Sequence, residues 1–277
     1  MQGIYWIASY PRSGNTWLRS MLNSYGRGGK PVDINDMPVS NLTYDRAFAD
    51  EVLGLATSDL TPAEVLALRP AVMRAVRDQC DSPVTLKTHD MRLRLADGDW
   101  LLPADVSLGG VYLVRDPRDV VLSLARFLDY SIDDAITVMG TGGHMRSISS
   151  SRQVLRLVSL WGSWSEHVSS WLSPEPFAIH VVRYEDLRRD PRYAMRGILR
   201  AFDQTVDDEK IAAAVDATSL HILRRQEDTQ GFVERWGPNR FFGSGRIGGW
   251  RTRLTAGQAA RIRRDHEAVM QRLGYLD

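Results

Sequence analysis

Four short apolar runs mark the chain, and each of them ends in turn residues or in a polar segment. They span residues 4–8, 84–86, 108–114 and 177–182. Runs of this length that are rich in β-branched and aromatic residues are typical of buried strands. Helical patterns fill the stretches between them. The alternation of strands with helices predicts an α/β fold with a central parallel sheet flanked by helices.

Helical periodicity is clearest in three places. Residues 15–22 place Trp17, Met21 and Leu22 on one side of a helix. Residues 153–171 are predicted to form one amphipathic helix, and residues 255–273 to form a closing helix. Residues 129–152 are rich in Gly and Ser after a first helical piece, and we expect a mobile flap there.

Length and composition limit the classes of protein. A chain of 277 residues can bury a full core, and we expect residues 1–277 to form a single domain. The net charge of +1 offers no general attraction to nucleic acid or to an anionic membrane. No signal peptide or membrane-spanning segment is recognisable, so we predict a cytoplasmic protein. Lysine is scarce beside arginine, which suggests a GC-rich bacterial genome.

The first apolar run leads through SYPRSG, residues 9–14, into a helix that begins at Asn15. A tight loop between a strand and a helix N-terminus presents free N–H groups and the positive end of the helix dipole to phosphate. Laid on the P-loop pattern G-x-x-x-x-G-K-[ST], residues 9–16 keep Gly14 and Thr16 but have Asn15 in the lysine position. This argues against ATP or GTP hydrolysis. With its cation at Arg12, the loop suits a 5′-phosphate that carries a transferable group.

Several motifs resemble those of the sulfotransferases that use 3′-phosphoadenosine 5′-phosphosulfate (PAPS). Residues 10–17, YPRSGNTW, resemble the family's 5′-phosphosulfate loop Y-P-K-S-G-T-T-W. Residues 87–89, KTH, follow the second apolar run and match the family's catalytic element. Residues 115–123, RDPRDVVLS, resemble its 3′-phosphate motif, and residues 184–187 read YEDL. The resemblance spans residues 10–250, and it implies a P-loop-like fold.

The resemblance also implies roles for individual residues. His89 would be the general base, with Lys87 and Arg12 beside the transferred group. The 5′-phosphate would lie on Arg12, Ser13, Gly14, Asn15, Thr16 and Trp17. Arg115 and Ser123 would bind the 3′-phosphate, and Tyr184, Thr218 and Leu220 would contact the adenosine. We expect Asp116 and Asp119 to cap the following helix or to orient arginines.

The last motif is the least faithful one. Against R-K-G-x-x-G-D-W, residues 243–250 keep Gly245, Gly248 and Trp250 but replace the Arg-Lys pair by Gly-Ser. The second arginine on the 3′-phosphate is therefore missing. Arg246, one residue beyond Gly245, is the substitute that the sequence suggests.

The resemblance implies sulfuryl transfer from PAPS, without a metal, to a hydroxyl group of a small-molecule acceptor in secondary metabolism. Trp161, Trp164, Phe127 and Tyr130 permit an apolar acceptor. Residues 32–80 are expected to line or cover its pocket. No nucleic acid partner is expected, and a homodimer stays open. Two alternatives also stay open: a P-loop kinase or NTPase that binds ATP with Mg²⁺, and a non-catalytic protein that binds adenosine 3′,5′-bisphosphate.

Overall fold

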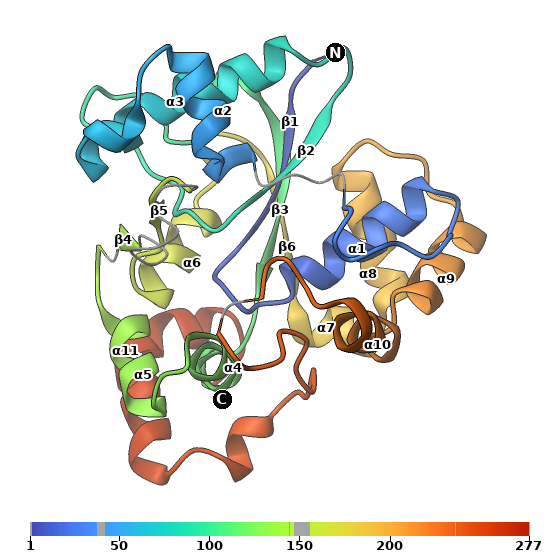
Figure 1. Cartoon of the computed structure of the whole chain (residues 1–277). Helices are drawn as coiled ribbons and strands as arrows, with labels where there is room; N and C mark the ends of the chain where they lie inside the picture. Colours follow the sequence, from blue (N-terminus) through green and yellow to red (C-terminus); the bar gives the residue numbers. More distant parts are fainter. Residues whose placement is uncertain (1, 38–41, 144, 147–155, 236, 277) are drawn as a thin grey trace.

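A parallel sheet of four strands forms the centre of the molecule, between two layers of helices (Figure 1). The computed structural model describes residues 2–37, 42–143, 145–146, 156–235 and 237–276. The strand order is β2-β1-β3-β6, where the strands are β1 (Ile4–Ser9), β2 (Val84–Thr88), β3 (Ser107–Val114) and β6 (Ile179–Arg183). All four predicted strands are present, and the predicted α/β fold is confirmed.

Alternate residues of β1 face the two sides of the sheet. Trp6 and Ala8 belong to one core, whereas Tyr5 and Ile7 belong to the other. The first core is covered by α2 (Arg46–Leu53), α3 (Pro62–Asp78), α4 (Pro117–Leu128), α5 (Ile132–Gly140), α6 (Trp164–Leu172) and α11 (Ala256–Arg272). The second is covered by α1 (Asn15–Gly26), α7 (Tyr184–Arg189), α8 (Pro191–Ala201), α9 (Asp208–Ala217) and α10 (Leu220–Gln230). Both faces of β1 are thus buried, which explains its continuous apolar sequence.

The carboxyl ends of the strands meet at one edge of the sheet, because all of them run in the same direction. The loop at residues 10–14 follows β1, His89 follows β2, and α4 follows β3 after two residues. Asp116 caps α4 by accepting a hydrogen bond from the N–H of Arg118 at 2.9 Å, and Pro117 is the first helical residue. The predicted start of this helix and the capping role of Asp116 are confirmed.

The helix predicted at residues 153–171 is wrong at its start. Residues 153–155 lie outside the described residues, and residues 156–163 are not helical. Within them β5 (Ser159–Leu160) pairs with β4 (Met145–Arg146). The helix begins at Trp164 because Ser163 and Glu166 form a capping box that fixes its N-terminus. Trp161 lies before this helix, but its spacing from Trp164 and Trp171 fits a helical period.

Short 3₁₀ turns complete the chain. They are η1 (Leu42–Tyr44), η2 (Thr57–Asp59), η3 (Ala104–Val106) and η4 (Gly249–Thr252). The closing helix α11 lies within the range that the sequence predicts. Residues 144 and 147–152 of the expected flap lie outside the described residues, so the flap stays a prediction.

Candidate functional site

The loop between β1 and α1 has the backbone of an anion-binding turn. Arg12 and Gly14 adopt positive φ angles of 72° and 105°. An added Cβ at Gly14 would lie 2.7 Å from a ring carbon of Tyr184, so only glycine fits there. Gly14 is also the N-cap of α1 and supplies no side-chain cap. The first N–H groups of this helix are therefore directed at the loop without a side-chain partner from the cap.

Asn15 occupies the position of the P-loop lysine, yet its side chain is directed back toward β1. Its amide nitrogen donates to the carbonyl of Ile7 at 3.1 Å and lies 3.3 Å from the Ser9 hydroxyl. Asn15 thus ties the loop to the strand. The buried side chain offers no charge that could reach a triphosphate.

The side chain of Arg12 is held inside the molecule. Its guanidinium lies over the rings of Phe127 and Phe241, at 4.8 and 4.2 Å from their centroids. It donates to the Ser123 hydroxyl at 3.1 Å and to the Phe241 carbonyl at 2.6 Å. The pKa of Arg12 is lowered to about 9, first by burial and then by the neighbouring charges of Arg126 and Arg115. Arg12 stays cationic at neutral pH.

Arg115 and Ser123 come from the end of β3 and from α4, and both line the same cavity. The guanidinium of Arg115 donates to the carbonyls of Arg12 at 3.2 Å and of Arg246 at 3.0 Å. It also lies 4.3 Å from the centre of the Tyr184 ring. The arrangement fixes Arg115 through backbone oxygens and leaves its charge without a carboxylate partner among the described residues.

The expected adenosine contacts lie on the α1 side of the cavity. Trp17, Tyr184 and Leu220 line it, as do Gly14, Asn15, Thr16, Gly245 and Arg246. Ser13 and Thr218 are fully buried and are not among the lining residues. Thr218 instead accepts the indole N–H of Trp17 through its carbonyl at 3.0 Å. Its structural role is to position Trp17, and direct contact of Ser13 or Thr218 with a nucleotide stays a prediction.

Lys87 and His89 lie at the end of β2 and line the cavity from the opposite side. His89 Nδ1 is 2.7 Å from the Ser9 carbonyl, which can only accept a hydrogen bond. Nδ1 therefore carries the proton, and Nε2 has the free lone pair. Burial lowers the pKa of His89 well below its usual value, and the nearby charge of Lys87 adds to this. His89 is neutral at pH 7 and can accept a proton.

A buried carboxylate that the sequence did not reveal holds Lys87. Glu234 lies 3.1 Å from the Lys87 ammonium and 2.7 Å from Arg19. Burial lowers the pKa of Lys87 to about 8, although Glu234 raises it. Burial raises the pKa of Glu234, but the two cations lower it more, so that it falls below its usual value. Glu234 comes from the segment after α10, where no local pattern marks it.

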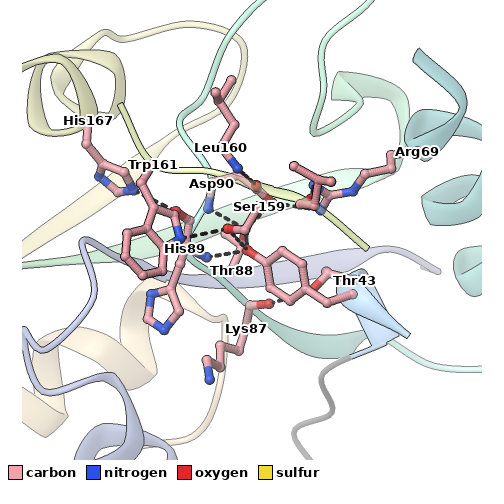
Figure 2. A network of polar contacts seen from close by, with 12 residues as sticks. Thr43, Arg69, Lys87, Thr88, His89, Asp90, Ser159, Leu160, Trp161 and His167 are labelled. Atoms are coloured by element: carbon pink, nitrogen blue, oxygen red, sulfur yellow. Dashed lines mark hydrogen bonds and ion pairs between the residues drawn. The ribbon is translucent and has the colours of Figure 1, made fainter. Parts of the chain in front are cut away.

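Behind Lys87 and His89 a buried polar network fixes the strand end, and Figure 2 shows both side chains extending away from it on one side. Arg69 on α3 pairs with Asp90 at 2.7 Å, and both side chains are fully buried. Asp90 also accepts the Thr88 hydroxyl at 3.1 Å. The Tyr44 hydroxyl accepts the backbone N–H of His89 at 2.7 Å. The network sets the direction of the backbone that carries the candidate base.

One cavity of about 370 Å³ joins the loop to the end of β2. Beside Lys87 and His89 its wall includes Tyr44, Leu157 and Trp161, whereas Phe127 lines it at the loop end, against Arg12. Of the four aromatic residues that the sequence suggested, Phe127 and Trp161 line the cavity. Trp164 is buried against His266, and Tyr130 is 44% exposed and lies outside it. Tyr44 comes from residues 32–80, the region expected to contribute to this pocket.

Arg126 also lines the cavity, although it belongs to none of the motifs recognised in the sequence. Its position three residues after Ser123 on one helix was an available signal, because residues three apart share a helix face. Asp119, expected to cap or to orient arginines, accepts the N–H groups of Gly248 at 2.6 Å and Trp250 at 3.0 Å. It thereby fixes the turn that follows Gly245.

Within the described parts of the chain, no helix combines the length and apolar character needed to cross a membrane. The described residues also contain no group of three or more His, Cys, Asp and Glu side chains placed to hold a metal ion.

Comparison with known proteins gives one consistent family. The family model described as "Sulfotransferase domain" matches residues 4–274. Human sulfotransferase 1C2 is 21% identical over 265 residues, which cover 92% of this chain and 79% of the relative. Rat sulfotransferase 1A1 is 25% identical over 221 residues, covering 79% of this chain and 66% of the relative.

Many solved structures resemble the fold, and two of them serve as examples. Retinol dehydratase in complex with androsterone and the inactive cofactor PAP has a TM-score of 0.61 at 19% identity, covering 96% of this chain and 80% of that one. Mouse sulfotransferase SULT7A1 complexed with PAP also has a TM-score of 0.61, at 16% identity, covering 98% and 84%. At these identities the likeness concerns the fold, an α/β fold of the P-loop-like type.

Proposed function

The chain belongs to the sulfotransferase family, and from this premise we propose that it transfers the sulfuryl group of PAPS to a hydroxyl group of a small-molecule acceptor. One observation carries the proposal: a single cavity joins the phosphate-binding loop, Arg115 and Ser123 to Lys87 and His89. The first group suits a nucleotide with phosphates at both ribose ends. The second group suits proton removal from an acceptor. Complexes of two structural neighbours with PAP support the choice of nucleotide.

The nucleotide side fits an anion in several independent ways. The N-terminus of α1 is directed at the loop, and the side chain of Arg12 carries a cation from the loop to Ser123 on α4. The Nε atom of Arg115, which lines the cavity, is buried and has no hydrogen-bond partner within the described parts of the chain. Buried donors of this kind are costly unless a ligand satisfies them. Bound phosphate oxygens would supply the missing acceptors.

The proposed step is an in-line transfer. The acceptor hydroxyl gives its proton to Nε2 of His89 while its oxygen attacks the sulfur atom. The bond between sulfur and the bridging 5′-phosphate oxygen breaks, and adenosine 3′,5′-bisphosphate leaves with the bond's electron pair. Lys87 and the N–H groups of the loop stabilise the charge that develops on the bridging oxygen. The guanidinium of Arg12, which donates to the Ser123 hydroxyl in this structure, would join them only after turning toward the loop.

Two charge states support these roles. The Nδ1 proton of His89 is held by the Ser9 carbonyl, and its lowered pKa keeps Nε2 free to accept a proton at pH 7. The pKa of Lys87, about 8, leaves it mostly protonated at pH 7. The acceptor would lie against the wall of Tyr44, Leu157 and Trp161, which favours an apolar molecule with one hydroxyl group.

Thermal unfolding with adenosine 3′,5′-bisphosphate, ADP and ATP–Mg²⁺ in parallel tests the nucleotide site. At about 100 times Kd, a ligand of the native state adds roughly 2.7 kcal/mol of stability. A marked rise in Tm with the bisphosphate supports the proposal, and a rise with ATP–Mg²⁺ alone would replace it by the kinase alternative. Transfer of label from sulfur-labelled PAPS to a panel of phenols and alcohols then tests catalysis. Tight bisphosphate binding without transfer favours the non-catalytic alternative.

Several expectations from the sequence stay predictions beside this proposal. They are the absence of a nucleic acid partner, a cytoplasmic location, a bacterial source, a role in secondary metabolism and a homodimer.

A further inference from the structure

Three arginine side chains, those of Arg12, Arg115 and Arg126, line the cavity near the loop and α4. Arg12 donates to the Ser123 hydroxyl at 3.1 Å and to the Phe241 carbonyl at 2.6 Å. Arg126 reaches the same carbonyl at 3.4 Å. Arg115 donates to the backbone carbonyl of Arg12 at 3.2 Å. All three arginines line the cavity, so their charges face one shared space.

Ion pairs within the described residues do not neutralise these three charges. Among the described residues, none of the three guanidinium groups forms an ion pair with a carboxylate. Burial lowers the pKa of Arg126, and the charges of other arginines add to this, although Glu227 raises it. Glu227 accepts hydrogen bonds from both backbone N–H groups of residues 241–242, at 2.5 and 2.9 Å. The cluster is therefore a concentration of positive charge that an anion in the cavity would stabilise.

Arg126 lies where a side chain from the loop at Gly243 would otherwise be. An added Cβ at Gly243 would lie 2.7 Å from Nη1 and 2.8 Å from Cζ of Arg126. The φ angle of Gly243 is outside the left-handed region, so its backbone conformation does not require glycine. The absence of a side chain instead leaves room for the guanidinium. The small residue on the loop and the long residue on α4 are complementary in size.

We propose that Arg126 binds the 3′-phosphate of the nucleotide together with Arg115 and Ser123, and so supplies from α4 the charge that the loop at Gly243 lacks. The inference rests on the proposed function and deepens it. The Nε atoms of Arg126 and Arg115 are both buried and find no hydrogen-bond partner in the described part of the chain, and phosphate oxygens would accept from them. Arg246, the substitute that the sequence suggested, is exposed, and its carbonyl anchors Arg115.

Calorimetric titration of the full chain with adenosine 3′,5′-bisphosphate and with adenosine 5′-monophosphate isolates the contribution of the 3′-phosphate. Arg126→Gln is expected to weaken the bisphosphate by about 10–100-fold, the usual range for a hydrogen bond to a charged group. Its affinity for the monophosphate should stay within about twofold, which also reports an intact fold. Arg115→Gln should give the same pattern. Arg225→Gln removes an exposed arginine of α10 outside the cavity and serves as the matched control.

An exchange of positions sharpens the test. Arg126→Ala combined with Gly243→Arg returns a guanidinium to the same space from the loop, and should recover most of the affinity that Arg126→Ala loses. Retention of the preference for the bisphosphate in Arg126→Gln, with its loss in Arg246→Gln, would overturn the inference and leave the proposed function standing. Equal binding of the two nucleotides by the unaltered protein would overturn both.

Discussion

The two ends of the cavity differ in what surrounds their positive charges: carboxylates at the end of β2, and backbone carbonyls at the loop. At the end of β2, Glu234 lies 3.1 Å from Lys87 and 2.7 Å from Arg19. Behind it, Arg69 and Asp90 form a second buried ion pair at 2.7 Å. Charges at this end are thus paired within the protein and hold fixed positions.

At the loop end, positive charge is not balanced by carboxylates. Arg12 and Arg115 donate to backbone carbonyls, and Arg12 also donates to the Ser123 hydroxyl. Neither arginine forms an ion pair with a carboxylate among the described residues. The two ends therefore suit different tasks. The loop end is prepared to receive an anion, and the β2 end keeps a neutral base beside cations that are paired with carboxylates in fixed geometry.

Removing the candidate base should give the largest effect. His89→Ala is expected to lower the turnover number by about 10²–10⁴-fold, because no base remains to accept the proton of the acceptor hydroxyl. The bisphosphate affinity should not change, since His89 lies at the other end. Steady-state kinetics and calorimetry measure the two quantities, and His221→Ala, at an exposed site on α10 outside the cavity, is the matched control. Near-normal turnover in a folded His89→Ala protein would remove the assigned role.

The pH profile of the unaltered protein adds a second check on His89. Its pKa is lowered well below the usual value. The base is therefore neutral throughout the neutral range, and protonation should reduce the rate only at clearly more acidic pH. A rate that already falls as the pH drops through 6.5 would contradict this.

Breaking the buried pair behind the site should cost stability next. Asp90→Ala leaves the Arg69 charge unpaired in the interior, and about 3–5 kcal/mol of unfolding free energy should be lost. Asp99→Ala, at a half-exposed pair with Arg74, should cost about 0–1 kcal/mol. Chemical denaturation measures both. If the two substitutions cost the same, the β2 end is not held by its internal charge pairing.

The smallest expected effect tests the pairing of Lys87. Its pKa is about 8, so the charged form that stabilises the leaving group is lost as pH rises through that value. Glu234 raises this pKa, and Glu234→Gln should therefore shift the alkaline fall of kcat/KM to lower pH, with less than about a tenfold loss at pH 7. In Lys87→Arg, by contrast, the fall near pH 8 should disappear because arginine stays charged. An unshifted profile in Glu234→Gln would show that the pair does not set the charge of Lys87.

Much of the site could be located from the sequence because its parts follow strands. Arg12, His89 and Arg115 each come directly after or close to an apolar run, and the carboxyl ends of parallel strands share one edge. The position of Pro117 likewise predicted where α4 begins. The helix predicted at residues 153–171 was wrong at its start for a local reason. The helical spacing of the tryptophans extends to Trp161, before the capping box at Ser163 where the helix begins.

The features that could be predicted from the residues of one segment are therefore local: the strands, the turn with its glycine, and the residues that follow each strand end. The partners of these residues are set by the packing of the folded chain. Lys87 meets Glu234 across 147 residues, and Arg126 fills the space beside Gly243. Such pairs depend on how separate helices and loops pack, and neither periodicity nor turn chemistry within one segment carries that information.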